Sequence, residues 1–438
     1  MIMSMLGQVR IRAFGLNLRA AAAGLALVGA FGLTVVATPA AQAQPTYKVL
    51  HNFTGGQDGG NPYSGVTMDK AGNLYGTTYD GGSGYGGVFK LKHSGSAWLF
   101  SPLYSFAGGN DGAGSNLAPL VFGPDGSLYG TTYQAADGGC GGGNGCGTVF
   151  KLQPAAAACK TALCPWTETV LYRFTGGSDG GNPTGSLVFD QTGNIYGTAR
   201  QGATPGCAGY GCGTVYKLTK SGGSWVQSVL YTFTGTGSDQ GMPMGGLIFD
   251  PSGNLDGATQ GCWAGGGVGA AFQFTPAGSG WTYNTIFTFG LYAGSCPIAG
   301  VISDSSGNLY GGTAIDGGEI FELSLSGGIW TLTRNYGLPG PNGGACGPGG
   351  ALVMDSAGNL YGTTVCDGVN NLGSVFKLTP SSGTWTYTDL HDFNGSDGAN
   401  PYSNLVFDSS GNLYGTASAG GTGLACAGGC GVVFEITP

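Results

Sequence analysis

The sequence contains little charge and little histidine. Only 9% of its 438 residues are charged, three are His, and 23 acidic residues outnumber 15 basic ones. The formal net charge of −8 is opposite to the concentrated positive charge that a nucleic-acid-binding surface needs. We therefore expect no nucleic-acid partner.

Long apolar runs are missing after the first part of the chain. The one such run, at 21–37, follows Arg10, Arg12 and Arg19 and precedes the small residues of "TPAAQAQ". This order of basic, apolar and small residues is typical of a secretory signal peptide. We predict a signal peptide over 1–43, a mature chain exported to the periplasm or the extracellular space, and no later membrane span. A single uncleaved anchor is the alternative.

Signals of catalysis are sparse as well. The chain has no His-Glu-x-x-His motif. A glycosidase needs two carboxylates, and Glu319 and Glu322, with Asp316 nearby, are the weak candidates for such a pair. His51 and His391 share one outer-strand position, which we interpret as tolerant because we align it with Ser105, Arg173, Thr232 and Thr288. We expect no catalytic residue, no cofactor and no metal ligand.

Glycine and cysteine, in contrast, are abundant. The chain has 92 Gly, but its aromatic content of 11% is sufficient for a core, so the glycines serve turns rather than disorder. Twelve Cys in an exported chain predict disulfides. The close pairs in small-residue loops are Cys140–Cys146, Cys159–Cys164, Cys207–Cys212 and Cys426–Cys430.

A 12-residue motif is repeated along the rest of the chain. The stretch "LVFDSSGNLYGT" (405–416) has six further copies, whose Tyr position is occupied by Tyr75, Tyr129, Tyr196, Asp256, Tyr310 and Tyr361. Each copy predicts a hairpin of strands a and b, closed by an Asp-initiated turn with Gly in the left-handed position. A third strand like 375–379 and a fourth like 385–393 complete the repeat. Short strands that are separated by Gly and recur with each copy of the motif are typical of propeller blades.

The ends of the chain predict a closed ring. The seventh copy stops after its third strand at Pro438, and Tyr47–Phe53 matches the fourth strand Tyr387–Phe393. We predict an all-β, seven-bladed β-propeller of four-stranded blades over 44–438, in which strand 46–53 completes the last blade. The blades begin near residues 64, 117, 185, 245, 299, 350 and 403.

The loops predict where a ligand would bind. In a propeller the b–c and d–a loops share one face, and here the b–c loops vary most. This arrangement allows Cys262 to meet Cys296 and Cys346 to meet Cys366, although the sequence alone allows other pairings. Trp263 follows Cys262 on that face and is the candidate ligand-binding residue.

Acidic residues recur in the d–a loops. They are Asp58, Asp111, Asp179, Asp239 and Asp397. A ring of carboxylates that binds calcium is one interpretation, and turn chemistry, in which Asp accepts from its own loop, is the favoured one.

The repeat also resembles a known family, the Gloeo/Verruco (GloVer) tandem repeats of choice-of-anchor repeat proteins. The matching motifs are the D-x-x-G-N-[LI]-Y-G-T cores, the G-x-V-[FY]-K-L-T strands at 213–219 and 373–379, and the F-T-G-G-x-D-G-x-N-P loops at 53–62 and 174–183. The resemblance implies an exported bacterial protein of unassigned activity.

The function that these features favour is binding. We expect a monomeric, non-catalytic interaction propeller for a glycan or a protein partner. A secreted carbohydrate-active enzyme with carboxylates in the central channel is one alternative, and a structural envelope or matrix protein is the other.

Overall fold

The computed structural model describes most of the compact unit Gln44–Pro438. The described residues are 44–95, 97–115, 117–134, 139–140, 145–154, 166–203, 206–262, 267–278, 280–290, 294–315, 318–340 and 346–438. The segment 1–43, for which we predict a signal peptide, lies outside them, and so do Cys159, Cys164, Trp263 and Asp316.

Seven antiparallel sheets, which we number as blades one to seven, form the described part of the chain. The strands of blades one and two are β2 (Val66–Met68), β3 (Leu74–Thr78), β4 (Gly87–Ser94), β5 (Ala97–Ser105), β6 (Val121–Phe122), β7 (Leu128–Thr132), β8 (Thr148–Gln153) and β9 (Thr167–Arg173). Blades three and four contain β10 (Gly181–Pro183), β11 (Val188–Phe189), β12 (Ile195–Gln201), β13 (Thr214–Ser221), β14 (Ser224–Thr232), β15 (Ile248–Phe249), β16 (Leu255–Thr259), β17 (Ala270–Ala277) and β18 (Gly280–Thr288).

The remaining blades repeat this order. Blades five and six contain β19 (Ser295–Pro297), β20 (Ile302–Ser303), β21 (Leu309–Ile315), β22 (Glu319–Ser326), β23 (Ile329–Gly337), β24 (Val353–Met354), β25 (Leu360–Thr364), β26 (Ser374–Ser381) and β27 (Thr384–Asp392). Blade seven consists of β28 (Val406–Phe407), β29 (Leu413–Ala417), β30 (Val432–Thr437) and β1 (Thr46–Asn52). One short 3-10 helix, η1 (Cys207–Gly209), lies in the b–c loop of blade three.

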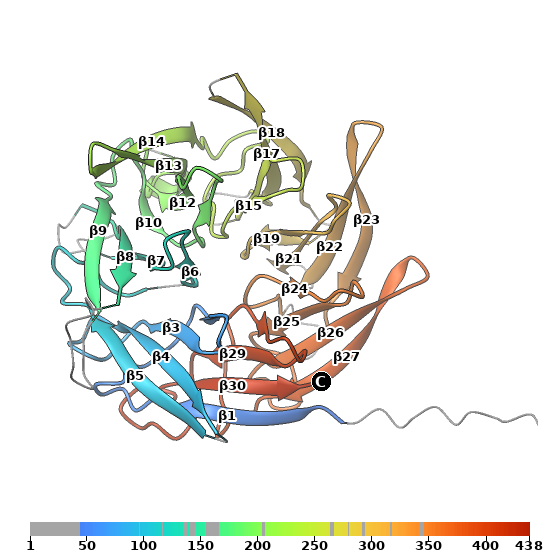
Figure 1. Cartoon of the computed structure of the whole chain (residues 1–438). Coiled ribbons are helices and arrows are strands. Elements are labelled where there is room, and N and C mark those ends of the chain that lie inside the picture. The colour runs from blue at the N-terminus through green and yellow to red at the C-terminus, as the bar shows by residue number, and fades with distance from the viewer. Residues whose placement is uncertain are drawn as a thin grey trace, which may run out of the picture. The chain divides into compact units, whose positions relative to one another are not determined.

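The N-terminal strand closes the ring, as the sequence predicts. β1 pairs antiparallel with β30, from Thr46 opposite Thr437 to Asn52 opposite Val432 (Figure 1). Blades seven and one are also joined near the centre, where Gly65 and Asn404 form a parallel bridge. The prediction of a seven-bladed, four-stranded propeller is therefore confirmed.

Hydrophobic cores lie between neighbouring blades. Blades seven and one share one such core, in which Phe53, Leu74 and Phe89 of the N-terminal region pack with Val433 of β30. The repeated Gly of the "YGT" motif allows close packing within a blade, because a Cβ at Gly415 would lie 2.6 Å from the ring of Phe434 on the adjacent strand. Burial on both sides explains why the inner strands are apolar on both faces.

The a–b turns are held by hydrogen bonds inside one hairpin. In blade seven, an Asp408 oxygen accepts the backbone N–H groups of Ser410 and Asn412, both at 2.8 Å, and the other oxygen accepts the Tyr414 hydroxyl. Gly411 has a φ of 86°, as the turn requires. Burial alone would raise the pKa of Asp408, but these hydrogen bonds outweigh it and lower the pKa below its ordinary value. The carboxylate is therefore committed to its own turn.

Candidate functional site

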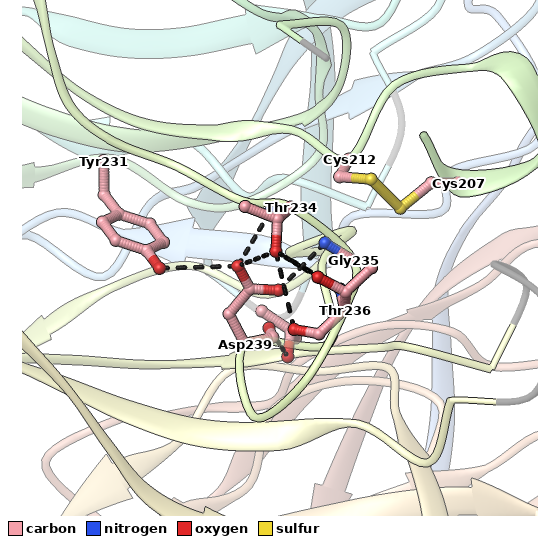
Figure 2. The surroundings of a disulfide bond; sticks show 8 residues. Cys207, Cys212, Tyr231, Thr234, Gly235, Thr236 and Asp239 are labelled. Carbon is pink, nitrogen blue, oxygen red and sulfur yellow. Dashed lines mark hydrogen bonds between the residues drawn. A yellow bond between two sulfur atoms is a disulfide. The ribbon is translucent and has the colours of Figure 1, made fainter. Parts of the chain in front are cut away.

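The b–c and d–a loops meet at the same end of each antiparallel blade and form one face, which we call the loop face. The acidic residues of the d–a loops are turned inward to their own loops. Figure 2 shows Asp239, which accepts the N–H groups of Thr234 (2.7 Å) and Gly235 (2.9 Å) and the hydroxyl groups of Thr234 and Tyr231. The equivalent Asp58, Asp111, Asp179 and Asp397 also accept hydrogen bonds from their own loops or the preceding strand. Turn chemistry thus occupies these carboxylates.

The alignment of the two strand histidines with Ser105, Arg173, Thr232 and Thr288 is wrong by one residue. The sheet register places His51 and His391 at the position of Tyr104, Tyr172, Tyr231, Phe287 and Tyr336. His51 Nε2 lies 3.2 Å from Asp58, and His391 Nε2 lies 3.1 Å from Asp397. In the same way, the Tyr104 hydroxyl donates a hydrogen bond to Asp111. The position is therefore a partner for the loop carboxylate and not a tolerant surface site.

Burial also shapes the chemistry of these two imidazoles. It lowers the pKa of His51 and of His391 below the ordinary value, although the neighbouring Asp acts in the opposite direction. The d–a loops that carry Cys296 or Cys346 instead of Asp follow strands with Phe287 or Tyr336 at this position. The strand residue does not follow the loop residue, because Tyr precedes Asp-bearing loops as well as the loop that carries Cys346.

Disulfide bonds hold the b–c loops. Among the described residues they are Cys140–Cys146, Cys207–Cys212, Cys262–Cys296, Cys346–Cys366 and Cys426–Cys430. Figure 2 shows Cys207–Cys212 beside Gly235, where a Cβ would lie 2.4 Å from the Cys207 sulfur. The carbonyl of the second Cys in this pair accepts the N–H of Met242 at 2.7 Å. The disulfide therefore stiffens the b–c loop where the outgoing d–a loop rests on it.

A side-chain latch fixes the same loops in three blades. Asn61, Asn182 and Asn400 all have positive φ, of 52°, 53° and 50°. Their amide nitrogens donate to backbone carbonyls at the ends of b strands, Asn61 to Ser418 and Asn182 to Tyr133, both at 2.8 Å. The Pro that follows each Asn fixes the next backbone dihedral. Latch and Pro together fix the backbone of the residue that comes after the Pro.

In five blades, residues that follow a Pro in the d–a loop, with or without a latch Asn before it, line a cavity at the mouth of the central channel. They are Tyr63, Met244, Ile298, Gly349 and Tyr402. Leu117, from the corresponding loop of blade two, and Tyr79, from the end of β3, complete the described lining of this cavity of about 430 Å³. Tyr63 contacts Tyr79 and Tyr402, with ring centroids 5.7 Å apart in both pairs. We call this cavity the mouth; sequence reasoning missed it, although the repeated Pro was a visible signal.

Next to the mouth, a smaller cavity of about 210 Å³ is lined by the starts of the a strands. Here the strands approach so closely that a Cβ at Gly245 would lie 2.1 Å from the backbone of Gly300. Neither cavity has a charged residue among the described residues that line it. The described lining of the mouth therefore presents an uncharged, partly aromatic surface.

The candidate carboxylate pair of blade five is not a pair. Glu319 and Glu322 lie three residues apart on β22, so their side chains point to opposite faces of the sheet. Glu322 forms an ion pair with Arg334 at 2.8 Å, and Glu319 accepts the Asn335 amide at 2.7 Å. The arrangement explains both residues structurally.

Metal-binding clusters and membrane-spanning helices are two further kinds of site that the described residues could form. Within the described ranges, no group of three or more His, Cys, Asp or Glu side chains could hold a metal ion. None of the helices in those ranges is long and apolar enough to cross a membrane. The ligand-binding role predicted for Trp263 stays a prediction, because that residue lies outside the described ones.

Solved structures share the fold at low identity. A chain of the mitotic checkpoint complex matches with 11% identity and a TM-score of 0.53, covering 98% of this chain and 99% of that one. Sqt1 from Chaetomium thermophilum has 15% identity and a TM-score of 0.50, covering 90% and 89%. A protein from Lactobacillus plantarum has 11% identity and a TM-score of 0.50, covering 79% and 88%. These likenesses show the fold alone, and no curated protein matches the chain.

The repeat itself defines the relationship. The Gloeobacter/Verrucomicrobia repeat matches over residues 30–268, 141–314 and 253–438, which together extend over the whole propeller. These matches include all seven copies of the a–b hairpin described above. The chain belongs to the Gloeobacter/Verrucomicrobia repeat family.

Proposed function

We propose that the protein is an exported, monomeric and non-catalytic propeller that binds a glycan in the mouth of its loop face. The observation that carries this proposal is the lining of the mouth, which combines Tyr63, Tyr79 and Tyr402 with aliphatic side chains and has no charged group among the described residues. Five disulfide bonds in the described part of the chain support export, because such bonds persist in oxidising compartments.

A sugar ring matches this lining better than a purely apolar ligand does. Each Tyr presents a flat apolar ring and a hydroxyl group, which suits the C–H face and the hydroxyl groups of a saccharide. Burial, and then the neighbouring Tyr402, raises the pKa of Tyr63, so its hydroxyl stays a neutral donor. The volume of about 430 Å³ lies within the ~300–1,000 Å³ of small-molecule sites.

A protein partner is the second candidate function. Large apolar side chains are exposed at the b–c loops of four blades, with exposed fractions of 46% for Tyr85, 56% for Tyr210, 83% for Val369 and 95% for Leu424. Such residues on variable loops are typical of interaction surfaces. The alternatives of a carbohydrate-active enzyme and of a structural matrix protein gain no support from the described cavities.

Binding of neutral oligosaccharides tests the proposal. The oxidised protein, expressed from the full sequence, is screened on an array, and hits are measured by calorimetry. Tyr63→Ala and Tyr402→Ala should each weaken binding by about tenfold or more, because stacking on an aromatic ring contributes on the order of 1–3 kcal/mol. Tyr85→Ala is the matched control, since Tyr85 is exposed outside the mouth. Equal binding by all four proteins, or no binding to any saccharide, would exclude this function.

A further inference from the structure

We propose that a second cavity of the loop face binds the carboxylate of an acidic saccharide, with Arg200 as the anion-binding residue. This inference rests on the proposed function and names its ligand class, a glycan that contains uronic acid. The cavity measures about 370 Å³ and lies between the b–c loops of blades two and three. Its described lining includes Tyr133, Asn182, Arg200, Gln201 and Tyr210, and Arg200 is the only charged residue in it.

Arg200 differs from the other arginines of residues 44–438. Arg173 donates from Nε to the carbonyl of Asn110 at 2.7 Å, and Arg334 forms an ion pair with Glu322 at 2.8 Å. The guanidinium of Arg200 has no partner among the described residues, and its Nε is buried without a hydrogen bond. A buried donor without an acceptor is costly, and a planar guanidinium matches the two oxygens of a carboxylate.

A second residue of the cavity lining also has a buried polar atom without a partner. Asn182 has an exposed fraction of only 3%, and its amide nitrogen is used by the latch to Tyr133. Its Oδ1, however, is buried and has no hydrogen-bond partner in the described part of the chain. The cavity lining therefore contains a cationic donor and a neutral acceptor, a combination that matches a carboxylate next to a hydroxyl group, as in a uronic acid.

The position of Arg200 in the repeat shows that the charge is specific to blade three. Arg200 is the residue immediately after the five-residue b-strand motif, which reads "LYGTT" in blades one, two and six. In blade order, this position holds Tyr79, Tyr133, Arg200, Gln260, Ala314, Val365 and Ser418. Because the position varies freely and is basic in a single blade, the repeat pattern does not account for the arginine.

The second cavity adjoins the mouth. Gln134, which lines the second cavity, lies 3.5 Å from the hydroxyl of Tyr79, which lines the mouth. The aromatic rings of Tyr79 and Tyr133 therefore belong to neighbouring cavities at successive blades. One oligosaccharide can place an uncharged ring against the tyrosines of the mouth and a uronic acid against Arg200.

Matched probes separate the charge from the sugar. Trigalacturonic acid and its fully methyl-esterified form share one carbon skeleton and differ in the three carboxylates. The oxidised wild-type protein should bind the acid about tenfold more tightly than the ester, and added salt should reduce that preference. Arg200→Gln should remove the preference by weakening the acid about tenfold while leaving the ester unchanged. Arg200→Lys should retain part of it.

Controls keep the two proposals apart. Arg173→Gln removes a positive charge outside both cavities and should leave the preference intact, and ester binding by Arg200→Gln shows that this variant is folded. If wild type binds acid and ester equally, or if Arg200→Gln keeps the preference, the inference is overturned while glycan binding in the mouth stands. If wild type binds neither probe nor any saccharide of the array, both proposals are overturned.

Discussion

The two faces of the propeller use similar residues in different ways. On the a–b turn face, the same Asp-Asn-Tyr group recurs in most blades, as in Asp355, Asn359 and Tyr361, and most of its hydrogen bonds stay inside one hairpin. On the loop face, the latch and the disulfides fix the backbone but leave the side chains that line the cavities without a repeated partner. Variation is therefore costly on the turn face and tolerated on the loop face, which is why we place the proposed binding residues on the loop face.

Blade four breaks the rule of the turn face. Asp256 replaces the repeated Tyr, has an exposed fraction of 0%, and accepts the amide of Gln273 at 2.9 Å. Its second oxygen is buried without a partner in the described part of the chain. Burial raises the pKa of Asp256 to about 7. In blades one, two, three and six a Lys lies over the Tyr ring instead, as Lys377 does over Tyr361 at 5.5 Å.

The largest loss of stability is expected when the Asp and Gln of blade four, Asp256 and Gln273, are introduced at the equivalent positions of blade six. The double substitution Tyr361→Asp with Lys377→Gln removes a buried ring that packs against Phe407, with centroids 5.1 Å apart, and adds a carboxyl near Asp355. The free energy of unfolding should fall by about 3 kcal/mol at pH 7, as measured by urea denaturation.

The same change on the other face is the control. Tyr402→Asp introduces a carboxylate at the half-buried rim of the mouth, where solvent reaches the side chain. It should reduce the free energy of unfolding by less than about 1 kcal/mol while impairing saccharide binding. Equal losses of stability for the two proteins would contradict the contrast between the faces.

A smaller effect is expected from the titration of Asp256. Its pKa of about 7 in the folded chain exceeds the unfolded value near 3.9, so the folded state binds more protons, and stability is lost as pH rises through this window. Asp256→Asn removes this titration and keeps an acceptor for Gln273. As pH rises from 5 to 8, the free energy of unfolding of the variant should increase relative to that of wild type by on the order of 2 kcal/mol. A constant difference across this range would show that Asp256 is already ionised at pH 5.

Much of the fold was predictable because its signals are local. The predicted strand 375–379 lies within β26 (Ser374–Ser381), and the N-terminal strand pairs as its similarity to 387–393 indicates. Strand a, predicted over 405–408, forms only the short β28 (Val406–Phe407). Just before this strand, blades six and seven approach closely, since a Cβ at Gly350 would lie 2.5 Å from the Ser403 backbone.

The cavities were less predictable because they depend on contacts between blades. Tyr63 and Tyr402 lie near opposite ends of the sequence and meet because ring closure makes blades one and seven neighbours. The sequence did not predict the role of His51 for a related reason, since its contact with Asp58 depends on the sheet register. The buried Phe53, two residues after His51, would have given the correct alignment with Phe106 and Phe174.

The contrast between blades four and six is sharpened by replacing the polar strand-c residue of each blade with Met. Gln273→Met removes the hydrogen bond to Asp256 and leaves a buried carboxyl without any partner, which should cost about 1–2 kcal/mol and raise the pKa of Asp256 further. Thermal unfolding at pH 6 and pH 8 measures both consequences, and the loss should be greater at pH 8, where the uncompensated carboxylate would have to ionise.

The matching change in blade six should have the smallest effect. Lys377→Met keeps the aliphatic stem over Tyr361 and removes only the ammonium group, which contributes about 0.5–1 kcal/mol through its interaction with the ring. The Tyr361 hydroxyl retains its hydrogen bond to Asp355 at 3.0 Å, so no buried polar group loses a partner. If Lys377→Met proves as destabilising as Gln273→Met, the Lys is an essential member of the repeated group, and blade four is tolerated only because Gln273 replaces it.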